Sequence, residues 1–119
     1  MPQLTHKLVQ YLDPQPTNRI LDVGCGDGKF TTYFIGKVAR VYGVDASSSF
    51  IESARTDYGS ETALFKVVDC RYLEKDSEVV NGTWDKVYDS HPQLSSRILL
   101  SALTLIVQSL ERCTAVHTA

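Results

Sequence analysis

The sequence predicts an α/β fold in which a parallel sheet is covered by helices on both faces. Short apolar runs alternate along the chain with segments of helical periodicity, and this alternation is typical of βαβ units. Three of the runs, at residues 19–23, 38–44 and 64–68, also end at or beside an aspartate. The carboxyl ends of parallel strands meet at one edge of a sheet, where ligands bind, so we expect these aspartates to lie together there.

The first elements follow from spacing and from chain breakers. A leading helix is predicted over residues 4–12, where leucines recur at helical spacing before two prolines end the pattern. Residues 19–23 form the first strand. A second helix is expected over residues 27–36, where it would bury Phe30 and Phe34 and end at a glycine.

The second strand, at residues 38–44, leads into a helix that stops at Gly59. Ser49 and Glu52 have the spacing of a capping box, in which a serine and a glutamate satisfy each other's backbone N–H groups. Ser47 is an equally good cap. The sequence leaves the choice between the two serines open.

The rest of the chain continues the alternation. Residues 64–68 and 84–88 are the third and fourth predicted strands, and residues 95–112 form an apolar helix. Residues 70–83 are assigned no more than a turn at Asn81-Gly82. The sheet is therefore expected to have about four strands.

Composition narrows the classes of function. The 119 residues support one domain, and a formal net charge of −2 lacks the basic footprint of a nucleic-acid binder. The three cysteines are too widely spaced for a disulfide framework or a metal site, which indicates a cytoplasmic protein. No apolar run reaches the ~20 residues of a membrane span. We therefore expect no nucleic-acid partner, no membrane association and no metal.

The stretch at residues 20–30 is the strongest candidate site. Its apolar run breaks into glycines at alternate positions, Gly24, Gly26 and Gly28. Glycine allows positive φ and a close backbone approach to a ligand, and a helix start presents unpaired N–H groups. The turn is therefore interpreted as a cradle for a nucleotide-like molecule. The alternative is a strand–helix connection that needs glycine for its geometry alone.

Residues 4–88 resemble the class I S-adenosylmethionine-dependent methyltransferases. The matching segments are LDVGCGDG at 21–28, GVDAS at 43–47, VDC at 68–70 and WDKVY at 84–88. The G-x-G-x-G spacing departs from the nicotinamide fingerprint, which would require a glycine at Lys29. The resemblance implies a Rossmann-like fold, S-adenosyl-L-methionine as cofactor and transfer of its methyl group.

The resemblance also implies a role for individual side chains. Asp45 would accept hydrogen bonds from the ribose hydroxyls, and Asp69 from the adenine amino group. Asp22 would face the cofactor's ammonium group, directly or through water, and Phe50 would flank the adenine. The implied cofactor-binding set is Asp22, Gly24, Cys25, Gly26, Gly28, Asp45, Ala46, Phe50, Asp69 and Cys70.

Each of these side chains has a structural alternative. Asp45 would otherwise be a solvated loop carboxylate, and Asp69 a helix cap. Asp22 would bond the N–H groups of its own turn. Phe50 would belong to the core, because it stands at helical spacing with other apolar residues.

His91 is the predicted catalytic residue. It follows the fourth strand, where the resemblance places groups close to the reactive methyl, and it would act as a general base. The alternative is a loop histidine that is partly exposed.

After Tyr88 the sequence departs from the family pattern. We expect a leading helix and linker at 1–18, a cofactor-binding core at 19–88 and a divergent helix at 89–119, in a chain shortened relative to the family's seven-stranded sheet. The fourth strand would then be an exposed edge, which with the apolar helix would favour self-association. Two functions follow: methyl transfer to a small-molecule acceptor, or cofactor binding without turnover.

Overall fold

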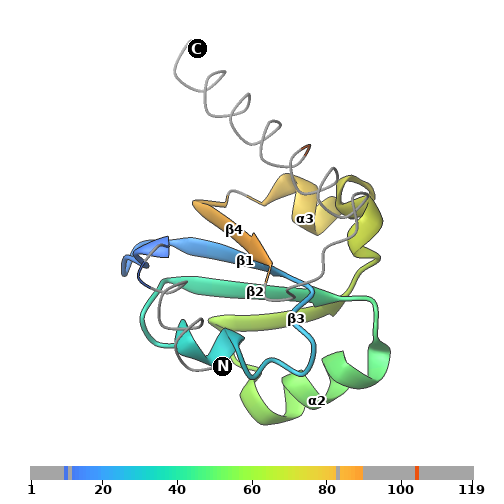
Figure 1. Cartoon of the computed structure of the whole chain (residues 1–119), viewed down its shortest axis with the longest axis horizontal. Helices are drawn as coiled ribbons and strands as arrows, with labels where there is room; N and C mark the ends of the chain where they lie inside the picture. Colours follow the sequence, from blue (N-terminus) through green and yellow to red (C-terminus); the bar gives the residue numbers. More distant parts are fainter. Residues whose placement is uncertain (1–9, 11, 83, 90–103, 105–119) are drawn as a thin grey trace.

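The computed structural model describes residues 10, 12–82, 84–89 and 104. Their four strands form one parallel sheet with the order β3-β2-β1-β4 (Figure 1). The strands are β1 (Arg19–Val23), β2 (Arg40–Asp45), β3 (Ala63–Val67) and β4 (Lys86–Asp89). The predicted parallel α/β sheet is confirmed, with the bounds of three strands shifted by one or two residues.

The strand order reverses beside β1. The chain runs outward from β1 to β2 and β3, then returns to place β4 on the other side of β1. Asp22 is therefore in register with Gly43 on one side and with Tyr88 on the other. Ligands of open α/β sheets bind beyond the carboxyl ends of the strands at such a switch point. Here that position is occupied by the glycine turn after β1.

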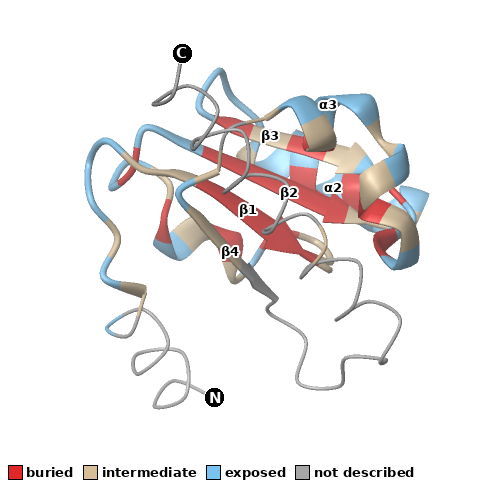
Figure 2. Ribbon diagram, turned by 90° about the horizontal axis from the view of Figure 1, so that it is seen from above, coloured by how far each residue is buried: buried red, intermediate tan, exposed pale blue. Residues whose placement is uncertain are grey.

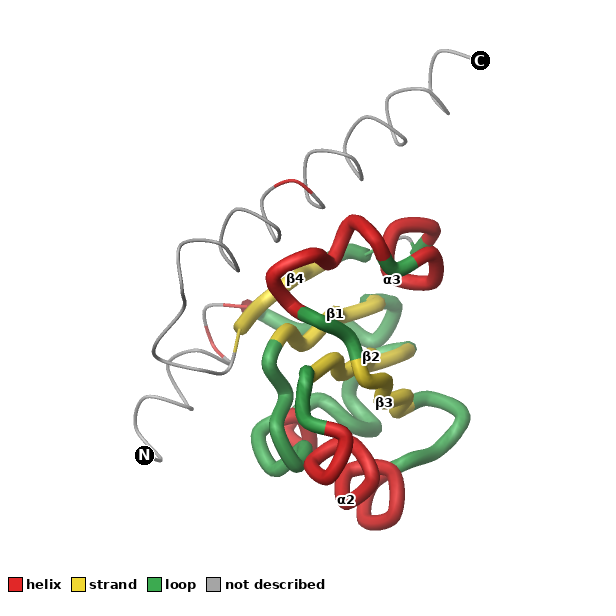
Figure 3. The backbone as a smooth tube through the Cα atoms, turned by 90° about the vertical axis from the view of Figure 1, so that its right-hand side faces the viewer, coloured by secondary structure: helices red, strands yellow, loops and turns green. Residues whose placement is uncertain are grey.

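Helical segments cover both faces of the sheet, as predicted (Figure 3). Helix α2 (Ser48–Tyr58) lies on one face, where Ile51 and Ala54 pack against Phe65. The 3-10 helix η2 (Cys70–Lys75) and helix α3 (Ser77–Asn81) lie on the other. The core on that face contains Leu21, Val23, Tyr42, Val44, Val68, Cys70, Leu73 and Val79.

The two central strands are the most deeply buried part of the described chain (Figure 2). Ile20, Leu21 and Val41 are completely buried. Strands covered on both faces need apolar side chains in succession rather than in alternation, which explains the continuous apolar runs in the sequence. This rigid pair of strands fixes the position of the turns at its carboxyl end.

The helix expected over residues 27–36 is wrong. The segment forms turns and one short 3-10 helix, η1 (Thr31–Tyr33), before Gly36 adopts a φ of +83°. Its residues are mostly β-branched or aromatic, which lose side-chain entropy in a helix. The Thr32 hydroxyl also donates to the carbonyl of Lys29, 2.7 Å away, and so competes with backbone pairing. The glycine turn therefore has no regular helix behind it.

Helix α2 settles the choice between its two candidate caps. The side chain of Ser47 accepts a hydrogen bond from the backbone N–H of Phe50 at 3.2 Å, and Ser47 has extended φ and ψ. The Ser49 and Glu52 capping box is wrong, because Ser49 already lies inside the helix. Residues 70–83, which the sequence left open, hold η2 and α3 up to Asn81.

Some predicted features lie outside the described residues. They include nearly all of the leading helix at 4–12 and of the apolar helix at 95–112, and all of His91. Within the described part of the chain, β4 pairs with β1 alone, so it is an edge there, as is β3. The same residues contain no helix long and apolar enough to span a membrane and no cluster of metal-binding side chains.

Candidate cofactor site

Three glycines with positive φ shape the turn after β1. Gly24, Gly26 and Gly28 have φ values of +71°, +57° and +87°. A side chain is strained in this region, so the sequence is restricted to glycine at these positions. A Cβ placed on Gly26 would meet nothing within 4 Å, whereas one on Gly28 would lie 3.1 Å from Tyr58. Gly28 is thus needed for packing against α2, and Gly26 opens on free space.

Asp45 joins the glycine turn to helix α2. One carboxylate oxygen accepts the backbone N–H of Gly26 at 2.9 Å, and the other accepts that of Ser47 at 2.8 Å. A carboxylate offers about four acceptor positions. Among the residues that the structure describes, each oxygen of Asp45 therefore keeps one further lone pair for a ligand. The carboxylate is not the freely solvated loop group of the alternative interpretation.

Asp22 lies beneath the turn. It is completely buried, and its carboxylate accepts a hydrogen bond of 2.6 Å from the hydroxyl of Thr31, which is also buried. Charge-assisted bonds of this kind are short and strong. The side chain of Asp22 thus braces the segment after the turn, and it does not line the open space beside Gly26.

Cys25 presents its backbone to the turn and its side chain to the core. A Cβ on Gly43 would lie 2.9 Å from its sulfur and 2.8 Å from Phe65, so glycine is required at position 43. Burial raises the pKa of the Cys25 thiol well above its usual range, and the charges of Asp22 and Asp45 act in the same direction. The thiol is therefore protonated and unsuited to nucleophilic attack.

Asp69 stands where the chain leaves β3 and enters η2. Its carboxylate caps η2 by accepting the backbone N–H of Arg71 at 3.1 Å, which is the capping role of the alternative interpretation. It also forms an ion pair with the Arg71 guanidinium at 2.9 Å. The side chain of Asp69 is 45% exposed, so it also remains accessible to a ligand. The next residue, Cys70, is buried in the core.

Phe50 is not a core residue, although its spacing allowed that interpretation. Phe50 is 49% exposed and lies in the first turn of α2, two residues after the helix begins at Ser48. Its neighbour Ile51 is completely buried. Ala46 is exposed in the loop that leads from Asp45 to α2. Both residues are therefore accessible at the surface, and both follow Asp45 closely in the sequence.

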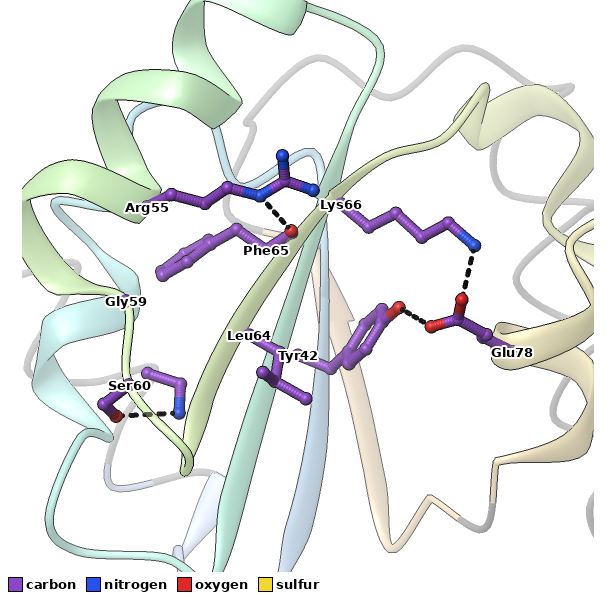
Figure 4. Close-up of a pocket in the computed structure, with 9 residues that line it drawn as sticks. Tyr42, Arg55, Gly59, Ser60, Leu64, Phe65, Lys66 and Glu78 are labelled. Atoms are coloured by element: carbon purple, nitrogen blue, oxygen red, sulfur yellow. Dashed lines mark hydrogen bonds and ion pairs between the residues drawn. The ribbon is translucent and has the colours of Figure 1, made fainter.

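A pocket of about 430 Å³ lies along β3, away from these residues (Figure 4). On its floor the phenol of Tyr42 donates to Glu78 at 2.8 Å, and the Lys66 ammonium contacts the other oxygen of Glu78 at 3.0 Å. The side chain of Arg55 donates from the opposite side to the carbonyl of Phe65. None of the predicted cofactor residues lines this pocket, so we do not assign the cofactor to it.

Sequence reasoning missed two partners of the predicted site. Thr31 carries no motif signal, because its contact with Asp22 depends on how the chain folds back after the turn. Arg71 has a weak signal: a cation two residues after Asp69 in a 3-10 turn can reach back to that carboxylate. The link between Asp45 and Gly26 likewise joins two segments that the sequence places 19 residues apart.

The fold and the glycine turn define a nucleotide-binding α/β domain of the methyltransferase class. The family model described as a methyltransferase domain matches residues 20–112, which is most of the chain. The chain therefore belongs to the class I S-adenosyl-L-methionine-dependent methyltransferases. S-adenosyl-L-methionine is the methyl donor of this class.

Curated relatives are similar over limited parts of their length. An uncharacterised methyltransferase of Schizosaccharomyces pombe is 38% identical over 55 residues, which are 46% of this chain and 21% of that protein. A 23S rRNA (uracil(1939)-C(5))-methyltransferase of Dechloromonas aromatica is 30% identical over 104 residues, covering 84% of this chain and 24% of that protein. This chain thus spans about a quarter or less of these two relatives.

Solved structures share the fold. A methyltransferase from Thiobacillus denitrificans, in complex with S-adenosyl-L-homocysteine, matches 92% of this chain and 44% of its own with a TM-score of 0.66 at 22% identity. A precorrin 8w decarboxylase from Methanobacterium thermoautotrophicum matches 90% of this chain and 56% of its own with a TM-score of 0.71 at 19% identity. At these identities the likeness concerns the fold alone.

Proposed function

We propose that residues 19–88 bind S-adenosyl-L-methionine across the carboxyl ends of β1, β2 and β3, and that the chain supplies the cofactor half of a methyl-transfer site. The acceptor in this proposal is a small molecule. The observation that carries it is the placement of the Asp45 carboxylate beside the free space at Gly26, joined by a hydrogen bond of 2.9 Å.

The geometry of Asp45 fits a ribose. Its two oxygens each accept one backbone N–H, from Gly26 and Ser47, and in the described part of the chain each keeps one lone pair. The two hydroxyls of a ribose are adjacent donors at the spacing of two carboxylate oxygens. An acidic residue reads the ribose of dinucleotides by the same chemistry.

The remaining predicted residues surround that contact. The backbone of Gly24, Cys25 and Gly26 would approach the sugar and the amino-acid tail. Asp69 would accept from the adenine amino group, and the exposed ring of Phe50 would pack against the purine face. Asp22 and Cys70, whose side chains are buried, would hold this arrangement in place, and Gly28 would let the turn pack against α2. The exposed Ala46 would border the cofactor beside Asp45.

The chain's own task in the reaction is to orient the reactants. S-adenosyl-L-methionine supplies, when bound, a methyl group made electrophilic by a sulfonium. The residues of this chain fix the adenosine and leave the methyl accessible to an acceptor. Alignment alone is worth up to ~7–11 kcal/mol of a barrier, so a methyl-transfer site needs few catalytic side chains. His91 remains the proposed general base.

A small-molecule acceptor is favoured by charge. The formal net charge is −2, and several cations of the described residues are already engaged. Lys66 pairs with Asp76 and Glu78, Arg71 pairs with Asp69, and the Lys86 ammonium donates to backbone carbonyls. Binding to a phosphate backbone requires cations that are free to contact it.

Calorimetric titration of the full chain with S-adenosyl-L-methionine tests the cofactor site. We expect saturable binding that Asp45→Ala abolishes, while Asp57→Ala on the exposed side of α2 leaves it unchanged. An absence of binding by the wild-type chain would overturn the proposal.

Turnover distinguishes the two functions that the sequence predicted. The cofactor-loaded chain is incubated with a panel of carboxylate, hydroxyl and carbon-acid acceptors, and in a separate arm with a 23S rRNA fragment, because some curated relatives are named for that substrate. Methylation in the panel supports the proposed acceptor class. Methylation of RNA alone would replace it, and binding without any product would select the cofactor-binding module.

A further inference from the structure

Arg71 holds the Asp69 carboxylate with three hydrogen bonds. Its backbone N–H and its Nε both donate to Oδ1, at 3.1 and 3.0 Å. Its terminal Nη2 donates to Oδ2 at 2.9 Å. A guanidinium that binds both oxygens of a carboxylate fixes the plane of that carboxylate as well as its position.

These contacts leave the two oxygens of Asp69 unequal. Oδ1 receives two donors, which use both of its lone pairs, whereas Oδ2 receives one. Within the described residues Asp69 therefore offers a ligand one acceptor position, on Oδ2. Asp45 differs, because it offers one position on each oxygen. The two carboxylates at the strand ends are thus prepared for different numbers of donors.

Arg71 is itself held in place by an aromatic ring. Its guanidinium carbon lies 5.6 Å from the ring centre of Tyr72, and the Lys75 ammonium lies 4.6 Å from the same ring. Cations at this distance are attracted to an aromatic ring. Arg71 also lowers the pKa of Asp69 below its usual value, so the carboxylate is ionised and acts only as an acceptor at neutral pH.

We propose that Arg71 is a positioning residue for adenine recognition: it turns Asp69 so that Oδ2 accepts one N–H of the 6-amino group and cannot reorient toward a 6-oxo purine. This inference rests on the proposed function. A 6-oxo purine carries an acceptor where adenine has its amino group and a donor at the neighbouring ring nitrogen. A carboxylate that could turn would accept from that ring nitrogen, whereas the one held by Arg71 faces the oxo group instead.

The test compares two probes, S-adenosyl-L-homocysteine and S-inosyl-L-homocysteine, by calorimetry on the full chain. The quantity measured is the ratio of their affinities. We expect the wild-type chain to prefer the adenosyl probe and Arg71→Ala to reduce that preference about tenfold, the equivalent of ~1.4 kcal/mol or one hydrogen bond. Arg71→Lys keeps the charge but lacks the two-pronged contact, so its ratio should be intermediate.

Lys75→Ala is the matched control. It removes one positive charge next to the same Tyr72 ring without a hydrogen bond to Asp69, and its ratio should equal that of the wild type. Equal weakening of both probes by Arg71→Ala would mean a merely structural role and would overturn the proposal, as would an unchanged ratio. Failure of the wild-type chain to bind either probe is a different result, because it would overturn the proposed function itself.

Discussion

The carboxylate of Asp45 lies 2.9 Å from the backbone nitrogen of Gly26, and this contact links the end of β2 to the turn after β1. The two segments are neighbours because β1 and β2 pair in parallel, with Val23 opposite Val44. The same carboxylate holds the first turn of α2 through Ser47. One side chain therefore fixes both sides of the proposed ribose site, and the described residues leave one acceptor position on each of its oxygens.

Asp45→Asn is predicted to weaken binding of S-adenosyl-L-homocysteine by about 10- to 100-fold, because hydrogen bonds to a charged acceptor contribute ~1.5–3 kcal/mol. The amide keeps the size of the side chain but replaces one acceptor by a donor. Calorimetry gives the affinity, and urea unfolding shows whether the turn is retained. Asp57→Asn, an exposed substitution on α2, is the control. Equal affinities for the two variants would contradict the assignment of Asp45.

Alanine at Gly26 and at Gly28 should separate binding from stability. Both positions have positive φ, which costs a side chain about 1–2 kcal/mol. At Gly28 the added methyl would also press on Tyr58 at 3.1 Å and Phe65 at 3.2 Å, so this variant should be the less stable of the two. At Gly26 the methyl enters free space, and the variant should fold yet lose cofactor affinity.

Urea unfolding and calorimetry on both glycine variants check this prediction. Unfolding midpoints are compared first, since they show which variant can be titrated at the working temperature. If Gly26→Ala bound S-adenosyl-L-homocysteine like the wild type, the free space above this glycine would not be the ligand's position.

The exposed ring of Phe50 should matter for binding more than for folding. With 49% of Phe50 exposed, Phe50→Ala is expected to change the free energy of unfolding by about 0.5 kcal/mol or less. It should nevertheless weaken cofactor binding several-fold, through loss of a ring stacked on the purine, worth ~0.5–1.5 kcal/mol. Ile51→Ala is the opposite case: Ile51 is completely buried, and the loss of stability should be ~2–5 kcal/mol. Unchanged affinity of Phe50→Ala would remove Phe50 from the site.

The sheet was predictable because its signals are local. Each strand is a short apolar run, and burial on both faces makes such runs continuous in the sequence. The aspartates at their ends could also be placed together, since parallel strands share one carboxyl edge. Asp45 and the glycine turn do meet there, as the hydrogen bond to Gly26 shows.

The segment after the glycine turn was not predictable in the same way. Phe30 and Phe34 suggested the buried face of a helix, and Phe34 is indeed completely buried. Its burial is achieved by turns instead, because the neighbouring threonines and aromatic residues favour other backbone conformations. The contacts of Asp22 with Thr31 and of Asp69 with Arg71 depend on side-chain direction, which residue spacing does not encode.

The hydrogen bond between Tyr42 and Glu78 predicts a stability that falls at high pH. Burial, reinforced by the bond to Glu78, raises the pKa of Tyr42 from 10.0 to about 12. A raised pKa means that the neutral phenol stabilises the folded state fully below pH 10, and that this contribution is lost as the pH rises toward 12. Asp76 and Glu78 also raise the pKa of the Lys66 ammonium. The stability that Lys66 contributes is therefore lost at high pH as well.

Tyr42→Phe removes the phenol but leaves Lys66 and its partners, so the variant should lose less stability than the wild type between about pH 10 and about pH 12. Tyr33→Phe, an exposed tyrosine outside this network, should follow the wild type. Urea unfolding at constant ionic strength measures both. On the acid side, bonds from Tyr42 and Lys66 lower the pKa of Glu78, so its contribution is present above its ordinary value of 4.5 and is lost as the pH falls through the lowered one. If stability declined equally in the wild type and in Tyr42→Phe at alkaline pH, ionisation of the Tyr42 phenol would make no contribution to that decline, and the prediction would be wrong.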